Sequence, residues 1–535
     1  MHSSLRNGRL SVVQRRGVVM ILVLVIVAVL SFAVYTFTQR TLLQYAAVRA
    51  SLDQVHRREL AASGVELSDA MIRRPDADQI LSSGAMTFEA IADGVTHLAI
   101  VRDLPGAGQS PQFGLADESA KLNINALDLR ISQRRQSRQR LLALPGMTVQ
   151  IADAILDWMD LDEEASEFGA ESSYYTSLHP PYRARQGRFT DLNELLLVKG
   201  VTSELLFGED RNGNGLLDPN ENDGANSKPM DDADGILDKG WVGYITLVSR
   251  ESISMPTGVP KINLNQPNLA SLYDALLPGF GREMARYAVL FRMRKATWAD
   301  DVRPPEKPDE EQKLLERIET AQKRLQLQRN GSGTSRTRRS PGDLERDGIR
   351  LAATPAYKFD SLVQLFGGRV RITIQNKDQF VASPWTADPG SLARLLPLAE
   401  QILTTSDRTV LEGRINVNQA SEAVLTSIPG LSRSRAHAIV RMQPKGQHST
   451  GAAYESVAWL AVRGVMPVAE LRRIAPYLTV SGDVQGGIAL GWLHDAPPVA
   501  GIRFVIDASG PERRVLLHKD LAILTQQQAG FAVAE

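Results

Sequence analysis

One uncharged stretch near the N-terminus limits the possible architecture of this chain more than any other feature. From Gly17 to Gln39 the sequence GVVMILVLVIVAVLSFAVYTFTQ carries no charged side chain. A helix of about twenty residues, at about 1.5 Å of rise per residue, crosses the hydrocarbon core of a bilayer. Ahead of this stretch lie four arginines, Arg6, Arg9, Arg15 and Arg16, and no acidic residue, which by the positive-inside rule keeps the N-terminus in the cytoplasm. The sequence therefore predicts one membrane-spanning helix followed by a long exported part.

The alternative is a cleaved secretory signal, with the SFA of residues 31–33 as its small-residue cleavage site. Such signals carry an apolar region of roughly 7–15 residues. The run in this chain is longer, which favours a retained membrane helix. Beyond it an apolar stripe continues from Leu42 toward Ala70 at helical spacing, so we expect one long helix over residues 18–70.

Composition excludes several classes of site. The chain has no cysteine, which removes disulfides, Cys-based zinc sites and thiol catalysis, and its eight histidines are scattered. The balance of 61 Lys+Arg against 61 Asp+Glu creates no global field that recruits a polyanion. Because no nucleophile and base stand in a recognisable pattern, the sequence does not predict an enzyme.

The junction QRRG, directly ahead of the apolar run, carries a family resemblance. Glycine leaves a peptide without a side chain at the cytoplasmic face, where a membrane-embedded peptidase can reach it. This pattern resembles the class III leader of type IV pilins and pseudopilins, and the resemblance implies cleavage after Gly17 and a mature chain that starts at Val18. Most members carry Glu at the fifth mature position, where this chain has Leu22.

That departure identifies the closest resemblance within the superfamily. A carboxylate in a bilayer-embedded helix bundle needs a partner, which in these filaments is the terminal amine of the neighbouring subunit. A subunit with nothing above it needs no such pair. The chain therefore resembles the large K subunit of type II secretion, a minor pseudopilin at the filament tip.

Three segments of the exported part share one pattern of residues. Each begins with Asn-x-Asn, continues as a short helix, turns at Pro-Gly and begins a second helix. A further helical signature and a β-like stretch follow each copy. We therefore expect three helix-hairpin-helix (or SAM-like) modules, whose turns lie at Gly146, Gly279 and Gly430 and whose hairpins lie within residues 122–156, 262–290 and 411–440.

Such hairpins also occur in DNA-binding proteins, where basic residues on the second helix contact phosphates. The third copy offers Arg433, Arg435 and Arg441, and the second copy is basic as well. The second helix of the first copy is acidic and would repel a phosphate backbone. Since one hairpin carries opposite charge in different copies, we interpret it as a packing element, which the K-subunit resemblance also implies.

An acidic segment after the first hairpin, DWMDLDEEASEFGAE at residues 157–171, is a candidate calcium site. A loop through Gly169 would bring Glu171 back to the helix end, and clusters of carboxylate oxygens suit Ca²⁺. A solvated acidic loop explains the composition equally well. The resemblance to the K subunit is most specific here, and it implies calcium in the exported part without assigning ligands. The candidates are Asp157, Asp160, Asp162 and Glu171.

A second candidate, DRNGNGLLDPNE at residues 210–221, fits the calcium-loop pattern at every position. Gly215 supplies the sharp turn, and an ordinary Asn/Gly loop rarely meets all the other requirements. Pro219 and the lack of a clear leaving helix favour a lone structural loop over a paired sensor. The expected ligands are Asp210, Asn212, Asn214, Leu216 through its carbonyl, Asp218 and Glu221.

These observations predict an α+β chain with a single N-terminal transmembrane and pilin-like helix, small β-sheet parts and repeated helical modules. The expected parts are a leader (1–17), the long helix (18–70), a pilin-like β region (71–121), the first module (122–209), the calcium-loop region (210–240), a strand with the second module and a disordered charged insertion at 296–350 (241–365), a strand and linker helix (366–410), the third module (411–480) and a C-terminal β region (481–535).

The function that the resemblance implies is that of a non-catalytic minor pseudopilin at the tip of the type II secretion pseudopilus. It implies a single-pass protein of the inner membrane with its bulk in the periplasm and structural calcium. Implied partners are other minor pseudopilins, the prepilin peptidase, the secretin and secreted cargo, whereas nucleic acid is not expected. The alternative is a membrane-anchored helix-hairpin-helix DNA receptor of the competence type.

Overall fold

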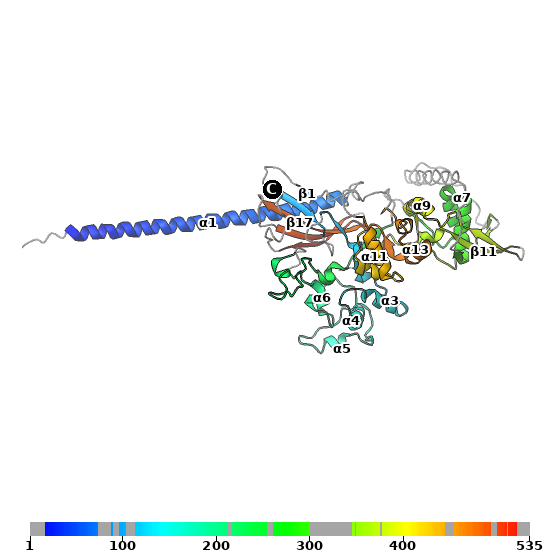
Figure 1. The fold of residues 1–535 in the computed structure, drawn as a ribbon, viewed down its shortest axis with the longest axis horizontal. Coiled ribbons are helices and arrows are strands. Elements are labelled where there is room, and N and C mark those ends of the chain that lie inside the picture. The colour runs from blue at the N-terminus through cyan, green and yellow to red at the C-terminus, as the bar shows by residue number, and fades with distance from the viewer. Residues whose placement is uncertain are drawn as a thin grey trace, which may run out of the picture. The chain divides into compact units, whose positions relative to one another are not determined.

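The chain folds as a mixture of helices and strands, as expected, and divides into two compact units, Met1–Glu59 and Leu60–Glu535 (Figure 1). The computed structural model describes residues 16–72, 87–88, 96–102, 113–211, 217–253, 260–298, 345–347, 349–374, 377–444, 454–493, 500–510 and 512–521.

The first unit consists of the apolar part of helix α1 (Arg16–Ile72). Gly17 and Val18 lie in its first turn, and the leader ahead of Arg16 is outside the described residues. Apolar side chains from Val19 onward are exposed, including Leu22. Within the described residues this is the helix long and apolar enough to cross a membrane, which is consistent with a single-pass anchor.

The second unit contains one antiparallel sheet that joins distant parts of the sequence. Its strand order is β1-β2-β17-β18-β19, and β3 also pairs with β17. The two β regions that we expected separately, at residues 71–121 and 481–535, therefore form one sheet, and the helical part is inserted between them. The strands are β1 (Thr87–Phe88), β2 (Thr96–Val101), β3 (Ala116–Asp117), β17 (Val484–Leu493), β18 (Ala500–Asp507) and β19 (Arg514–Asp520).

The last turns of α1, from Leu60, pack on one face of this sheet. Ala61 and Val65 share a buried cluster with Ile100, Ala489 and Phe504. Gly64 permits the close approach, because a Cβ there would lie 2.8 Å from Leu98 Cδ1 and 2.9 Å from Ala489 Cβ. The burial of these side chains anchors the helix end to the sheet.

The first helical region has its own core, which runs from Leu122 to Ile245. Trp241 belongs to it and donates its indole N–H to the carbonyl of Pro145 at 2.7 Å, so the expected boundary at residue 241 divides one packed region. The elements are η1 (Glu118–Ala120), β4 (Leu122–Asn123), η2 (Ile124–Ala126), α3 (Ile131–Leu141), α4 (Val149–Met159), α5 (Ser172–Tyr175), η3 (Leu192–Leu197), α6 (Ser203–Phe207), η4 (Pro219–Glu221), η5 (Gly240–Gly243) and β5 (Ile245–Thr246).

The remaining helices surround one continuous core from Leu264 to Leu478, so the second and third expected modules are not separate domains. Their elements are β6 (Arg250–Ser252), β7 (Ile262–Asn263), α7 (Leu269–Met293), β8 (Ala296–Trp298), β9 (Glu345–Arg346), β10 (Ile349–Arg350), η6 (Leu362–Leu365), β11 (Gly368–Ile374), β12 (Lys377–Ala382), α9 (Pro389–Ile402), β13 (Leu403–Thr404), β14 (Val410–Glu412), β15 (Ile415–Asn416), α10 (Glu422–Thr426), α11 (Arg433–Met442), α12 (Trp459–Val462), α13 (Val468–Ile474), η8 (Ala475–Tyr477) and β16 (Leu478–Thr479).

Residues near both ends of the predicted charged insertion, 296–350, belong to described strands. Strand β8 pairs with β11, and β9 pairs with β10, so both ends of that range are ordered by backbone hydrogen bonds. Residues 299–344 of the predicted insertion lie outside the described residues.

One asparagine in each expected module makes the same pair of hydrogen bonds. Asn125 Nδ2 donates to the carbonyls of Phe189 and Leu247 at 2.9 and 3.2 Å. Asn265 bonds in the same way to Phe359 and Thr405, and Asn418 to Tyr454 and Val480. Each asparagine follows a short parallel strand pair, β4 with β5, β7 with β13, and β15 with β16. The second Asn of each Asn-x-Asn is therefore a local cross-link.

The predicted hairpin turns differ between copies. Gly146 and Gly430 have φ of 65° and 85°, in the left-handed region that suits glycine. In the second copy Gly279 is helical, and the non-helical residue is Gly281, with φ of 78°. Copies one and three have Thr148 and Ser432 at that position, where their hydroxyls cap the second helix. The second copy has glycine there instead, so its turn moves two residues downstream.

We expect Asn265→Ala to lower the free energy of unfolding by about 2 kcal/mol, because three backbone groups lose their partner. Asn265 bonds to Phe359 and Thr405, and its Oδ1 accepts from Phe359 N at 2.8 Å. Thermal melting of the full chain in detergent measures the change. Asn226→Ala is the control, because Asn226 is exposed and makes one bond, to Asp223 O. Equal melting of both variants would contradict the cross-link.

Candidate metal centre

Helix α4 places three carboxylates on one face. Thr148 Oγ accepts a hydrogen bond from Ile151 N and begins the helix. Asp153, Asp157 and Asp160 then follow at helical spacings of four and three residues, so their side chains lie above one another. Their exposed fractions are 0%, 0% and 6%. Asp153 was not among the predicted ligands, although this spacing could have identified it.

The loop after α4 folds back onto Asp157. Ser166 donates from its backbone N and its hydroxyl to Asp157, at 3.0 and 2.8 Å, and Lys199 Nζ donates to the carbonyl of Gly169 at 3.1 Å. A Cβ at Gly169 would overlap the Asp157 carboxylate, so the loop requires glycine there. The loop thus returns Glu171 to the helix end, as its predicted path requires.

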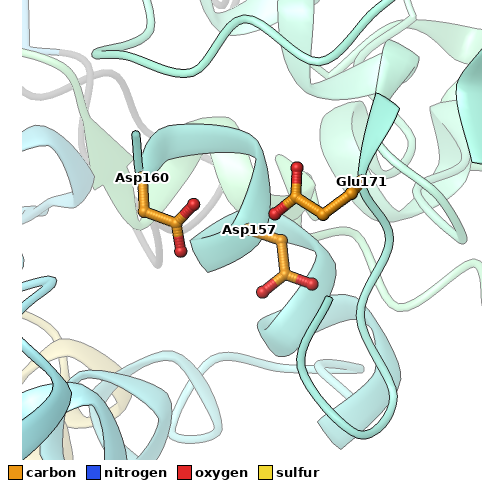
Figure 2. A group of neighbouring side chains, drawn as sticks. All are labelled: Asp157, Asp160 and Glu171. Atoms are coloured by element: carbon orange, nitrogen blue, oxygen red, sulfur yellow. The ribbon is translucent and has the colours of Figure 1, made fainter. Parts of the chain in front are cut away.

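Three of the four predicted ligands come together. Figure 2 shows Asp157, Asp160 and Glu171 around the end of α4, and one carboxylate oxygen from each lies within 4.8 Å of the others. Asp162 does not join them. It is exposed and its Oδ1 accepts from Glu164 N at 3.0 Å, because the chain has left the helix and its side chain turns to the local backbone.

The cluster has more negative charge than its arginines compensate. Arg134 pairs with Asp157 and Asp160, and Arg138 pairs with Asp153 at 2.7 Å. Two guanidinium groups thus face four buried carboxylates when Glu171 is included, which leaves a formal excess of two negative charges. Isolated buried charge of this kind is costly unless it is paired or neutralised.

Glu171 carries that excess most directly. It is 2% exposed, and within the described residues neither carboxylate oxygen has a hydrogen-bond partner. Burial, together with the negative charges of Asp160 and Asp157, raises the pKa of Glu171 to about 8. Oxygen-only donors with unsatisfied lone pairs, whose full ionisation would leave an excess of two negative charges, fit a hard divalent cation such as calcium. The cation would replace the proton on Glu171 and link the loop to the helix end.

The second predicted loop is described only in part. Asp210, Asp218 and Glu221 are buried, whereas Asn212, Asn214 and Leu216 lie outside the described residues. Glu221 Oε2 accepts a hydrogen bond from Asp218 N at 3.0 Å. Burial raises the pKa of Glu221 to about 8, and the negative charges of Asp218 and Asp210 add to this effect. The carboxylates of Asp210 and Asp218 are therefore close enough to that of Glu221 to disfavour its ionisation.

In comparison with known proteins, the first cluster lies within a segment of this chain that matches a family model. Residues 120–207 match the family model described as type II secretion system (T2SS), protein K. The resemblance to the protein K family is thus confirmed. The matched range contains Asp157, Asp160 and Glu171, and it ends before the second loop.

The relatives are matched over part of their length. The chain is 31% identical over 202 residues to protein K of Pseudomonas aeruginosa, covering 35% of this chain and 57% of the relative. It is 24% identical over 208 residues to that of Klebsiella pneumoniae, covering 36% and 60%. The chain thus spans less than two thirds of these relatives. A solved GspK–GspI–GspJ complex from enterotoxigenic Escherichia coli has a TM-score of 0.35 at 11% identity, covering 90% of this chain and 99% of the other.

We expect Gly169→Ala to lower the free energy of unfolding by about 2 kcal/mol, because the methyl group must displace the Asp157 carboxylate or the loop. Thermal melting of the full chain measures the loss. Gly187→Ala is the matched control: the nearest atom to its added Cβ is Arg185 Cγ at 3.9 Å. If both variants melt like the unsubstituted chain, the packing of the loop against Asp157 is not what holds the cluster together.

Proposed function

We propose that this chain is a non-catalytic minor pseudopilin that caps the tip of the type II secretion pseudopilus and contributes to protein export across the outer membrane. The observation that carries the proposal is the match of residues 120–207 to protein K. The exposed apolar surface of α1 supports it, because a helix of this kind suits both a bilayer and a bundle of filament helices.

The proposal assigns a location and partners. The chain enters the inner membrane with its bulk in the periplasm, and the prepilin peptidase cleaves it after Gly17. After cleavage α1 joins the filament, where Leu22 stands in place of the usual glutamate. The globular part contacts other minor pseudopilins, and the secretin and secreted cargo are its further partners.

The three hairpins serve in this proposal as duplicated packing modules. The matching bonds of Asn125, Asn265 and Asn418 support common ancestry, because independent loops have no reason to use the same cross-link between the same elements. The modules would provide surfaces that bind other subunits, and the shared asparagine hydrogen bonds would stabilise the fold of each module.

The alternative role as a DNA receptor is not favoured, since Arg292 of the second copy and Arg433 and Arg435 of the third have structural partners. Arg292 is buried and donates to the carbonyls of Leu264, Gln266 and Tyr357. Arg433 pairs with Glu422 at 3.0 Å, and Arg435 pairs with Glu470 at 3.4 Å. A phosphate backbone would have to compete with these carboxylates.

Calcium has a structural role in the proposal. One ion would bind Asp157, Asp160 and Glu171, whose oxygens converge and whose charge is in excess. A second would bind the loop of residues 210–221, through Asp210, Asp218 and Glu221 together with the expected Asn212, Asn214 and Leu216. Both ions would stabilise loops after export, because calcium is available outside the cytoplasm.

We expect Gly17→Leu to leave the chain uncut, because a bulky side chain at the scissile peptide blocks the peptidase. Mass spectrometry of the intact membrane-extracted protein should find a mature chain that starts at Val18 in the unsubstituted protein and the full leader in the variant. Export of secreted proteins should fall in the same cells. Gly8→Leu is the control, since it alters a leader glycine away from the junction. An uncut unsubstituted chain would contradict the proposal.

We expect calcium to raise the melting temperature of the full chain in detergent, because an ion that binds only the folded state stabilises it. Glu171→Gln should reduce the shift by removing a ligand charge, whereas Asp162→Asn should leave it unchanged. Melting is measured with calcium and with a chelator. Absence of any shift in the unsubstituted chain would argue against structural calcium, and an equal loss in both variants would argue against this cluster as the site.

A further inference from the structure

A polar pocket of about 320 Å³ lies where the first and third helical regions meet. Helix α3 and the residues ahead of it form one wall, and the other walls come from residues 412–414, at the end of β14, and from η8. Gln136 Nε2 donates to the Tyr477 hydroxyl at 2.7 Å across this junction. The pocket is therefore built from two regions distant in sequence.

Arg140 of α3 lines this pocket, and no acidic side chain in the described part of the chain forms an ion pair with it. The residue is 8% exposed, and within the described residues its buried Nε and Nη2 have no hydrogen-bond partner. Its guanidinium carbon lies 6.0 Å from the centroid of the Tyr477 ring, a contact at the outer limit of a cation–π interaction. Burying a charged guanidinium without hydrogen-bond partners costs folding free energy, which suggests that a further group satisfies these donors.

The acidic residues of the pocket do not provide that counter-charge. Asp128 is bound by Arg130, whose Nε lies 2.9 and 3.0 Å from its two oxygens. Glu412 pairs with Arg188 and Arg250, each at 3.2 Å. Both carboxylates are thus already compensated. Burial lowers the pKa of Arg140 to about 10, which still leaves the side chain charged at neutral pH.

The unpartnered atoms have a defined geometry. Nε and Nη2 form one edge of the guanidinium, and this edge binds a carboxylate through two parallel hydrogen bonds. The Tyr477 hydroxyl accepts from Gln136, so its own hydrogen can be donated to a further acceptor in the pocket. Arg140 and Tyr477 thus both line the pocket, and each has hydrogen-bond donor capacity that the described residues leave unused.

We propose that this pocket is a binding site for a carboxylate, which is held by the Nε–Nη2 edge of Arg140 and the hydroxyl of Tyr477. The carboxylate belongs either to a small organic acid or to an acidic side chain or C-terminus of a partner protein. Binding would link the first and third helical regions through the ligand. The site is independent of the calcium clusters and of the proposed role in secretion.

The experiment is isothermal calorimetry on the full chain in detergent, with succinate at constant ionic strength. Succinate should bind, and Arg140→Leu should weaken binding about tenfold or more, because a charge-assisted bidentate contact is lost. Arg463→Leu is the matched control: that arginine also lies over a tyrosine ring, 4.8 Å from the centroid of Tyr454, but is exposed. Tyr477→Phe should weaken binding several-fold, and it tests the site if Arg140→Leu fails to fold.

A short peptide ending in two glutamates distinguishes the two sources. Tighter binding of the peptide than of succinate assigns the site to a partner protein, whereas equal or weaker binding assigns it to a small acid. If neither ligand binds, or if succinate binds Arg140→Leu and Tyr477→Phe as well as it binds the unsubstituted chain, the proposal is overturned and Arg140 has only a packing role.

Discussion

The second unit of the chain, Leu60–Glu535, depends on strand β17, which joins its beginning to its end. β17 pairs with β2 and β3 on one edge and with β18 on the other, and nearly all of its residues are buried. The end of helix α1 packs on the same sheet through Ala61 and Val65. Everything between β3 and β17 is therefore an insertion into a small helix-and-sheet unit. In this arrangement the inserted helical part can differ in length while the sheet and the end of α1 keep their packing.

In the inserted part, buried polar side chains determine how neighbouring segments are joined. Asn125, Asn265 and Asn418 each connect two segments through backbone carbonyls, which specifies how strands and helices meet. The carboxylates at the end of α4 and the guanidinium of Arg140 carry charge that the described residues do not fully compensate. Such groups are expensive in a low-dielectric interior, so they mark the places where ions or ligands are expected to complete the structure.

Much of this organisation could be predicted from local sequence patterns. The apolar run from Gly17 to Gln39 predicts α1, and Asp157, Asp160 and Glu171 are read correctly as neighbours because one helix and one short loop bring them together. The pairing of residues 96–101 with 488–493 could not be predicted, since it depends on contacts distant in sequence. The Pro-Gly motif predicts the second turn at Gly279, but the turn lies at Gly281, because glycine stands there in place of the capping Thr148 or Ser432 of the other copies. The unpaired state of Arg140 could not be predicted from the sequence, because it arises from the pairing of the nearby carboxylates with other arginines.

Co-purification is the most direct test of whether this chain assembles with other minor pseudopilins, as we propose. The full-length chain would be expressed together with the remaining minor pseudopilins of the same cell, extracted in detergent and purified through a tag on this chain alone. The account predicts a stoichiometric complex that contains the other minor pseudopilins and survives size-exclusion chromatography. Elution of this chain without any pseudopilin, while the others still associate with one another, would contradict the account.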